Sequence, residues 1–150
     1  MITEPIPEFD FPEDRHYDGD NHMWVKFEPT THRVYCGIDA LGLEALGDMA
    51  YISLQVTGGP VERGESIGTL EAAKMTAAVI APVSGTLVAR NEPAMRDPLL
   101  VNQDPYGQGW LVAIEPGDWQ KEAATLVHGP AIVAWVEAEI DRYRRQGWID

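Results

Sequence analysis

Lys74 is the side chain of this sequence whose setting best suits covalent chemistry. It lies in the stretch GTLEAAKMTAAVIAPVSGTL (68–87), between two runs that have the composition of β-strands. Its neighbours Ala72, Ala73 and Thr76 are small, so they leave a long amine accessible at the tip of a turn. Such a tip gives a modifying enzyme room to reach the amine, although an ordinary solvated lysine would fit the same surroundings.

The remaining side chains that could do chemistry lack the spacing that catalytic or metal sites need. The four histidines are scattered, without the short intervals of metal-ligand motifs: His16, His22, His32 and His128. No serine stands in a Gly-x-Ser-x-Gly segment, and no glycine-rich phosphate loop is present. The single cysteine, Cys36, lies in the apolar run RVYCGI, which favours a buried structural thiol over a nucleophile. We therefore expect a protein that is not itself an enzyme.

Composition and charge narrow the classes of partner. The chain has 150 residues, 45% of them hydrophobic, which is enough for one domain with a core. Its formal net charge of −13 argues against nucleic acid and anionic membranes and favours docking on basic enzyme surfaces. No apolar run approaches the ~20 residues of a membrane span. The acidic, proline-rich start lacks the basic and apolar parts of a signal peptide, so we expect a cytoplasmic protein.

The elements that must position Lys74 are mostly short strands. Strand-like composition, bounded by glycine, proline and other turn residues, recurs at 22–28, 32–38, 49–56, 68–71, 78–83, 86–89 and 110–116. The first two runs are joined by Pro29-Thr30-Thr31 in the manner of a hairpin. Many short strands with frequent turns predict a mainly β fold, either a sandwich or a flattened barrel.

Two helices are expected among these strands. Asp39 is placed as the N-cap and Gly47 as the stop of a helix of about two turns. Near the end of the chain, Val136, Ile140 and Tyr143 recur at helical spacing, which predicts an amphipathic C-terminal helix. EAAKMTAA could also form a helix by composition, but it is short and flanked by strand-like sequence. We expect an irregular acidic extension at 1–20, a β domain at 21–118 and a C-terminal helical segment at 119–150 that packs on the domain.

Several blocks in the right order make the chain resemble the glycine cleavage system H protein family of lipoyl carriers. The matching blocks are NHMW, GIDALGLEALGDMAYISL, VERGESIGTLEAAK, APVSGTLVARNE and LVNQDPYGQGW, and the similarity covers about two thirds of the chain. The resemblance implies a flattened lipoyl/biotinyl-type barrel-sandwich hybrid and lipoate attached to Lys74 through an amide bond. It also implies that Glu71 and Gly85 serve recognition by the lipoate-attaching ligase and the geometry of the hairpin. His22 and Trp24 would line the cleft in which the lipoyl arm rests when it carries its cargo.

The resemblance further implies a monomeric shuttle that serves several enzymes. The lipoyl arm would carry a covalently bound fragment between partners and be reoxidised by thiol–disulfide exchange. The implied partners are a lipoate-attaching enzyme and dihydrolipoamide dehydrogenase, together with the enzymes of one pathway. The segment PAMRDPLLVNQDPYGQG (93–109) reads as a long connection with three prolines. Within it, we expect Asn102, Asp104 and Tyr106 to brace the structure rather than to do chemistry.

Departures from the family pattern leave the pathway open. This chain has Glu-Ala-Ala-Lys-Met around Lys74 where the family commonly has Glu-Ser-Val-Lys-Ala, and His-Met-Trp where the family has His-Glu-Trp. These departures favour the lipoate-binding proteins of heterodisulfide-reductase-like sulfur oxidation. The alternative is the glycine cleavage system itself, with glycine decarboxylase and aminomethyltransferase as partners and an aminomethyl group as cargo. A biotinyl carrier is a further alternative, disfavoured because Ala73 replaces the methionine that precedes the biotinylated lysine, and an unmodified binding protein is another.

Overall fold

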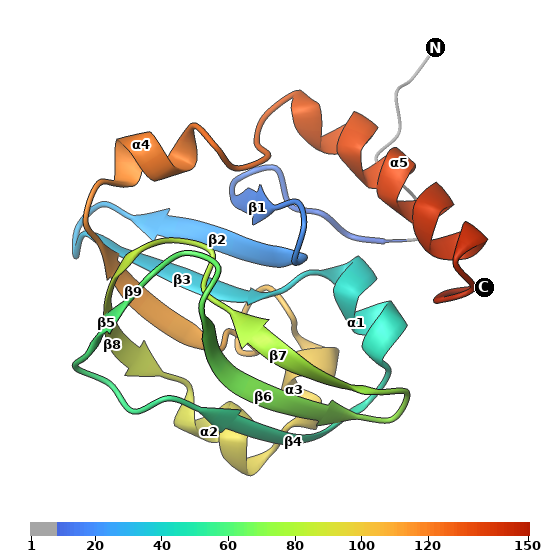
Figure 1. Ribbon diagram of the computed structural model, residues 1–150, viewed down its shortest axis with the longest axis horizontal. Helices are drawn as coiled ribbons and strands as arrows, with labels where there is room; N and C mark the ends of the chain where they lie inside the picture. Colours follow the sequence, from blue (N-terminus) through green and yellow to red (C-terminus); the bar gives the residue numbers. More distant parts are fainter. Residues whose placement is uncertain (1–8) are drawn as a thin grey trace.

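Two antiparallel sheets stacked face to face form the body of the protein in a computed structural model that describes residues 9–150 (Figure 1). The larger sheet has the strand order β1-β2-β3-β9-β8-β5, and the smaller has the order β4-β6-β7. The strands of the larger sheet are β1 (His16–Asp18), β2 (Met23–Glu28), β3 (Arg33–Ile38), β5 (Pro60–Val61), β8 (Gly85–Arg90) and β9 (Val112–Pro116). Those of the smaller sheet are β4 (Met49–Leu54), β6 (Ser66–Ala72) and β7 (Thr76–Ile80). The mainly β prediction is confirmed, and the sheets form a sandwich rather than a closed barrel.

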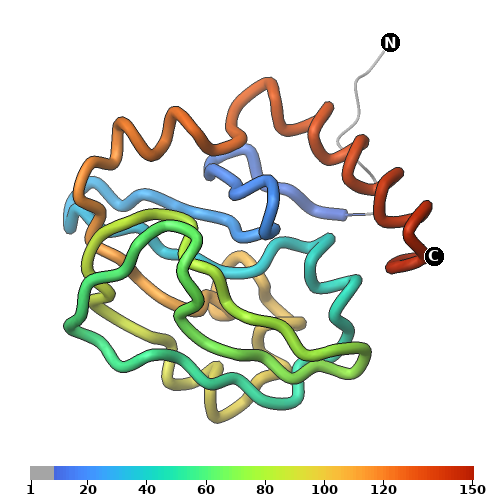
Figure 2. The backbone as a smooth tube through the Cα atoms, viewed as in Figure 1, coloured from blue at the N-terminus to red at the C-terminus, as the bar shows by residue number. Residues whose placement is uncertain are grey.

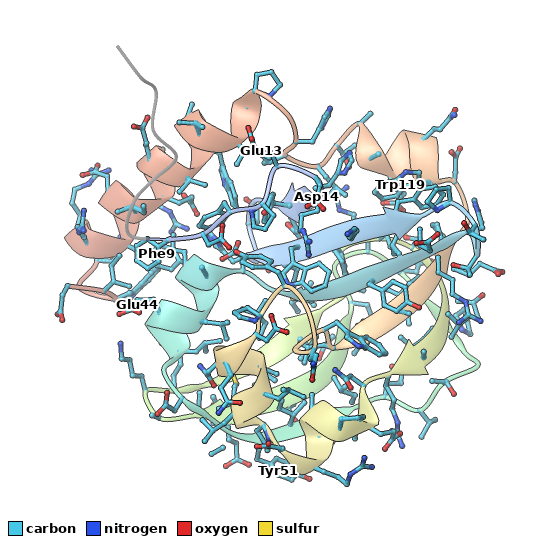
Figure 3. The ribbon with its side chains drawn as sticks, turned by 180° about the vertical axis from the view of Figure 1, so that it is seen from behind. Phe9, Glu13, Asp14, Glu44, Tyr51 and Trp119 are labelled. Atoms are coloured by element: carbon cyan, nitrogen blue, oxygen red, sulfur yellow. The ribbon has the colours of Figure 1, made fainter. Side chains whose placement is uncertain are left out.

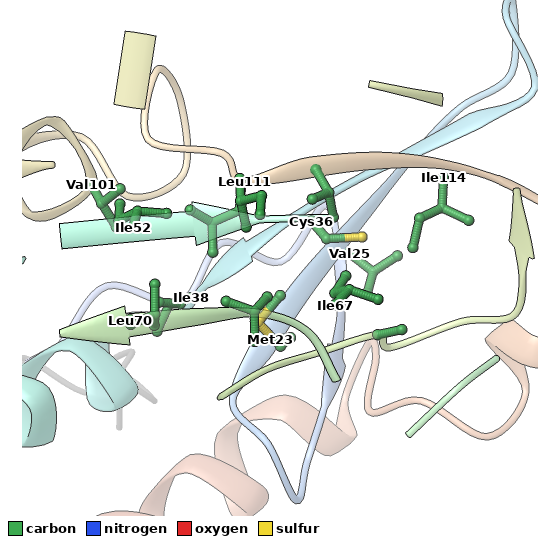
Figure 4. Close-up of a cluster of buried hydrophobic side chains, with 14 of the residues drawn as sticks. Met23, Val25, Cys36, Ile38, Ile52, Ile67, Leu70, Val101, Leu111 and Ile114 are labelled. Atoms are coloured by element: carbon green, nitrogen blue, oxygen red, sulfur yellow. The ribbon is translucent and has the colours of Figure 1, made fainter. Parts of the chain in front are cut away.

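The core lies between the two sheets because one face of each is apolar. In Figure 4, Met23, Val25 and Cys36 of the larger sheet point toward Ile67 and Leu70 of β6. All five side chains are at most 2% exposed. The predicted hairpin between β2 and β3 is also confirmed, since their residues pair in register along both strands.

Five helices lie among the described residues. They are α1 (Ala40–Leu46), α2 (Glu92–Arg96), α3 (Leu99–Gln103), α4 (Trp119–Ala123) and α5 (Ala131–Arg145). The Asp39 side chain accepts a hydrogen bond from Gly42 N at the start of α1, and Gly47 ends it with φ +84°, as predicted. Both expected helices, α1 and α5, are therefore confirmed. Helices α2 and α3 lie in a connection that the sequence presents only as proline-rich, because five residues are too few to show a helical period.

Helix α5 covers a second apolar cluster on the outer side of β1 and β2 (Figures 1 and 2). Ile132, Val136 and Ile140 of α5 pack there with Tyr17 and Trp24. The 1–20 segment differs from expectation, because its residues 16–18 form β1 and pair with β2; its residues 1–8 lie outside the described part. No helix within residues 9–150 is both long and apolar enough to cross a membrane.

Candidate functional site

Lys74 lies at the tip of the β6–β7 hairpin. Glu71 pairs with Thr76 at the last register position, and the Ala72 N–H donates to the Met75 carbonyl at 3.0 Å, which closes the turn. The prediction of a turn is confirmed, and the helical alternative for EAAKMTAA is wrong. Pairing of β6 with both β4 and β7 satisfies the backbone of this segment in a sheet, which a short isolated helix would not achieve.

The hairpin tip is held against the end of α1. The Ala73 N–H donates to the Asp48 carbonyl at 2.9 Å, and the Lys74 N–H donates to the Leu46 carbonyl at 3.0 Å. Gly47 lies beneath the tip, where an added Cβ would come 3.3 Å from both the Ala73 Cβ and the Lys74 Cγ. Figure 2 shows the hairpin end beside α1, although the two segments are separate in the sequence. The lysine therefore stands on a fixed base.

Asn102 braces the segment on which the hairpin rests. Its Nδ2 donates to the Gly47 carbonyl at 3.1 Å, and its Oδ1 accepts from the Met49 N–H at 2.8 Å. One amide from α3 thus ties the end of α1 to the start of β4. Tyr106 acts similarly, because its hydroxyl accepts from the Ala40 N–H at 2.9 Å. The bracing role predicted for this connection is confirmed at both residues.

The Lys74 side chain is exposed and its amine is reachable. Nζ donates to the main-chain carbonyl of Glu44 at 2.8 Å, and within residues 9–150 it forms no ion pair with a carboxylate. Glu44 belongs to the last turn of α1, where unpaired carbonyls and the helix dipole attract a positive charge. Figure 3 shows Glu44 at the outer surface of α1, on the same side of the molecule as Phe9.

Two cavities flank the hairpin tip, and they differ in character. A cavity of about 510 Å³ includes Lys74 in its wall and is mixed in character, with the polar side chains of Asp10, Glu44, Asp48 and Asn102 beside apolar ones such as Phe9 and Leu43. The second cavity, of about 300 Å³, has a mostly apolar wall to which β7 and α1 both contribute. We call the second one the apolar cavity; its wall includes Met23, Leu46, Met75, Ala77, Tyr143 and Trp148.

His22 lies at the edge of the apolar cavity and is almost fully enclosed, at 2% exposure. Its Nδ1 is 2.8 Å from Asp39 Oδ2, and its Nε2 is 2.8 Å from Glu139 Oε1 on α5. Burial lowers the pKa of His22, but the hydrogen bonds and charges of the two carboxylates outweigh burial, so its pKa is raised. Burial raises the pKa of Asp39, while hydrogen bonds from Arg142 and then from His22 lower that of Glu139.

The other residues proposed for the site are not gathered at the hairpin tip. Glu71 is exposed on β6, three residues before Lys74. Gly85 starts β8 and pairs with Pro116, where an added Cβ would collide with the Glu115 carbonyl. Trp24 is buried, donates from Nε1 to the Pro105 carbonyl at 2.9 Å, and faces a different cavity from that beside His22. Of the two predicted cleft residues, only His22 lines the apolar cavity.

Neither a metal-binding cluster nor a thiol adds to the surroundings of Lys74 within residues 9–150. No group of three metal-binding side chains occurs between residues 9 and 150. Cys36 is fully buried, as predicted, and burial raises the pKa of its thiol well above the ordinary value. Sequence reasoning missed the pairing of His22 with Asp39 and Glu139. The sequence indicated Asp39 only as a helix cap, and Glu139 lies 117 residues after His22 in the chain.

Comparison with known proteins identifies relatives of this arrangement. The model of a family described as "Glycine cleavage H-protein" matches residues 15–139. Two curated relatives are glycine cleavage system H proteins. The one from Anaeromyxobacter sp. (strain K) is 35% identical over 130 residues, spanning 87% of this chain and 98% of the relative. The one from Thermus thermophilus is 40% identical over 109 residues, spanning 73% and 83% respectively.

The fold also matches a crystal structure of a related protein. A glycine cleavage system H protein from Mycobacterium marinum superposes with a TM-score of 0.74 at 32% sequence identity. The match covers 86% of this chain and 98% of that protein. The fold over most of the chain is therefore shared with an experimentally determined relative.

Proposed function

Given that the chain belongs to the glycine cleavage H-protein family, we propose that it carries lipoate on Lys74 and serves as the carrier subunit of a glycine cleavage system. Members of this family are non-catalytic subunits of a multienzyme system and bear lipoate on a lysine. The observation that carries the proposal is the exposed amine of Lys74 on a hairpin tip that is anchored to the end of α1.

Lys74 fits this role better than the other two lysines of the chain, Lys26 and Lys121. Lys26 lies within β2, so its backbone is part of a sheet. Its Nζ forms an ion pair with Asp14 Oδ2 at 3.3 Å. Lys121 lies within the short helix α4. Only the tip of a tight hairpin presents a lysine on a narrow projection that an attaching enzyme can enclose.

The surroundings of Lys74 suit lipoate. Small side chains at Ala72 and Ala73 leave the base of the arm uncrowded, and the apolar cavity begins beside the neighbouring residue Met75. His22 lies at the edge of that cavity, in keeping with its predicted place in an arm cleft. Bound lipoate supplies a disulfide that can be opened, take up an aminomethyl group on sulfur and close again by thiol–disulfide exchange.

The charge of the protein is suited to visiting several enzymes. The net charge is −13, and exposed acidic side chains surround the hairpin tip: Glu44, Asp48 and Glu71. Basic docking surfaces on the partners would be steered toward this end of the molecule. We propose as partners a lipoate-attaching enzyme, glycine decarboxylase, aminomethyltransferase and dihydrolipoamide dehydrogenase.

The sulfur-oxidation system, which the departures around Lys74 favoured, receives no support from the comparisons. The matching family model and the relatives named above are glycine cleavage H proteins. Substitutions within the blocks are therefore better regarded as variation within this family than as a sign of another pathway.

Intact-mass measurement after incubation with a lipoate-attaching enzyme tests the attachment site. The unaltered protein should gain the mass of one lipoyl group, as should Lys26→Arg and Lys121→Arg, whereas Lys74→Arg should gain none. A full lipoyl mass on Lys74→Arg would overturn the assignment. The modified protein should then support exchange of the glycine carboxyl group with bicarbonate by glycine decarboxylase. Failure of that exchange with a correctly lipoylated protein would contradict the pathway.

A further inference from the structure

The region between α1 and α5 contains a continuous chain of polar contacts that ends at the apolar cavity. Asp39, at the N-cap of α1, contacts His22, and His22 contacts Glu139 of α5. Glu139 in turn accepts two hydrogen bonds from Arg142, at 2.9 and 2.8 Å. We call Asp39, His22 and Glu139 the histidine clasp.

The far end of this chain of contacts reaches the wall of the cavity. The Arg142 guanidinium lies over the rings of Tyr143 and Trp148, 5.1 and 5.5 Å from their centroids. The two rings also meet edge to face at 5.0 Å, and both line the apolar cavity opposite the hairpin residue Met75. Trp148 remains 41% exposed, so the wall that it forms stands at the cavity mouth.

When Asp39 and Glu139 are both ionised, the clasp requires a proton on each ring nitrogen of His22. Both nitrogens lie 2.8 Å from a carboxylate oxygen, and a neutral imidazole has only one N–H to donate. Loss of one proton would leave a nitrogen lone pair facing a carboxylate oxygen, which is repulsive. The ring cannot turn to another partner, because it stacks on Trp135 at 5.1 Å and meets the edge of Tyr143 at 5.1 Å.

The charged and titratable groups facing His22 come from two helices. They are Asp39 from the cap of α1, Glu139 and Tyr143 from α5, and Arg142 behind Glu139. Burial raises the pKa of Tyr143 to about 12, so this phenol stays neutral near neutral pH. Asp20 faces Arg142 and adds to the negative surroundings. The imidazole ring is therefore the one member of the group whose ordinary pKa lies near neutrality.

We propose that His22 is a positioning residue that, through Glu139 and Arg142, holds the Tyr143–Trp148 wall of the apolar cavity closed. Release of one proton from the ring to solvent frees α5 at its C-terminal end and opens the cavity. Where the proposed lipoyl arm is concerned, this inference rests on the proposed function, because the cavity lies beside the lysine that would carry it. The clasp would then determine how accessible the lipoyl group is to solvent while the protein is not bound to a partner enzyme.

Hydrogen exchange of α5 in unmodified Lys74→Arg protein tests the clasp independently of lipoate. Glu139→Gln removes the acceptor charge, and Glu137→Gln is the matched control, since Glu137 is exposed on the same helix. We expect exchange of residues 139–148, corrected for intrinsic rates, to accelerate about tenfold or more in Glu139→Gln and to be unchanged in Glu137→Gln. In Lys74→Arg protein with no second substitution, the protection of residues 139–148 against exchange should fall as pH rises above neutrality. This pH dependence should be absent when His22→Asn is added.

A second measurement concerns the arm itself. In lipoylated protein, a small thiol should reduce the lipoyl disulfide several-fold faster in Glu139→Gln than in Glu137→Gln. Equal exchange in the two variants, or a pH dependence that persists in His22→Asn, would overturn the clasp even if Lys74 is correctly lipoylated. Faster exchange with unchanged reduction would overturn its control of the arm. Absence of lipoate from Lys74 would contradict the proposed function but would leave the exchange result intact.

Discussion

Lys74 and Glu44 meet where the hairpin crosses the end of α1: Nζ of the lysine donates a 2.8 Å hydrogen bond to the main-chain carbonyl of the glutamate. The attraction includes a helix-end charge effect, which an uncharged side chain would lose. Acylation of Lys74 would therefore weaken the tie between its side chain and α1 while leaving the backbone contacts of the hairpin intact.

Neutralising Lys74 should cost little stability. Because its side chain is exposed, Lys74→Gln should change the free energy of unfolding by less than about 0.5 kcal/mol, and Lys121→Gln should behave alike. Urea denaturation of the two variants measures this. A loss above about 1 kcal/mol in Lys74→Gln alone would mean that the charge supports the fold.

Gly47→Ala should disturb the presentation of Lys74. Gly47 has φ +84°, and its added Cβ would press on the hairpin tip, whereas Gly58, at φ +103°, has no heavy atom within 4 Å of such a Cβ. Both alanine variants should lose about 1–2 kcal/mol of stability through the positive φ. Only Gly47→Ala should also slow lipoylation, measured as the initial rate of mass gain. Equal lipoylation rates in the two variants would contradict the idea that the close approach positions the lysine.

Glu71→Gln should weaken recognition by the attaching enzyme. Its exposed carboxylate lies on β6 near the tip, and loss of one charge-assisted contact at about 1.5 kcal/mol corresponds to about a tenfold lower kcat/KM. Glu62→Gln removes an exposed acid elsewhere on the surface and should leave the rate unchanged. If both variants are lipoylated at the same rate, Glu71 has no part in recognition.

Replacing His22 should be far more costly than replacing a comparable histidine. His22 and His32 both have φ +55°, a conformation that asparagine tolerates, so His22→Asn and His32→Asn differ mainly in burial. Removing His22 leaves the Asp39 carboxylate enclosed without its partner, so we expect a loss of about 3 kcal/mol. His32→Asn should stay within about 0.5 kcal/mol. Denaturant titration compares them, and similar values for the pair would rule out a stabilising role for the buried histidine.

Stability should also depend on pH through the clasp. The pKa of His22 is raised by folding, so its contribution is complete below the ordinary value of 6.5 and is lost as pH rises through the folded value. Asp39, whose pKa is also raised, acts in the same direction. Glu139 acts oppositely: its pKa is lowered, so its contribution is present above the ordinary 4.5 and is lost as pH falls through the folded value.

Unfolding free energies measured from pH 5 to 9 should therefore fall toward the alkaline end. In His22→Asn that decline should become smaller, because the contribution of His22 is lost and only that of Asp39 remains. A decline of unchanged size in this variant would assign the pH dependence to another residue.

The strands and the turn at Lys74 could be predicted because the residue types that determine them are close together in the sequence. Short apolar runs broken by glycine and proline determine where β6 and β7 begin and end, and small residues mark the tip between them. Helices α2 and α3 could not be found in this way, since five residues within a proline-rich connection show no periodicity. Local composition also gave no sign of β1, which pairs with β2 and bridges through Tyr17 to Val127.

The clasp lay beyond sequence reasoning for a different reason. His22 and Glu139 come together only when α5 folds back across β1, so their contact depends on tertiary packing. The capping position of Asp39 was readable, but capping uses only one of its oxygens. The other oxygen contacts the imidazole of His22, and no local sequence pattern predicts this contact.

The sealed position of Cys36 has a consequence for a protein that would carry a reactive disulfide. It is the only cysteine in the chain, it is 0% exposed, and burial keeps its sulfur in the unreactive thiol form. A mixed disulfide between the protein and its own cargo group is thereby prevented. Such an internal disulfide would inactivate the carrier, and burial of Cys36 between the sheets prevents its formation.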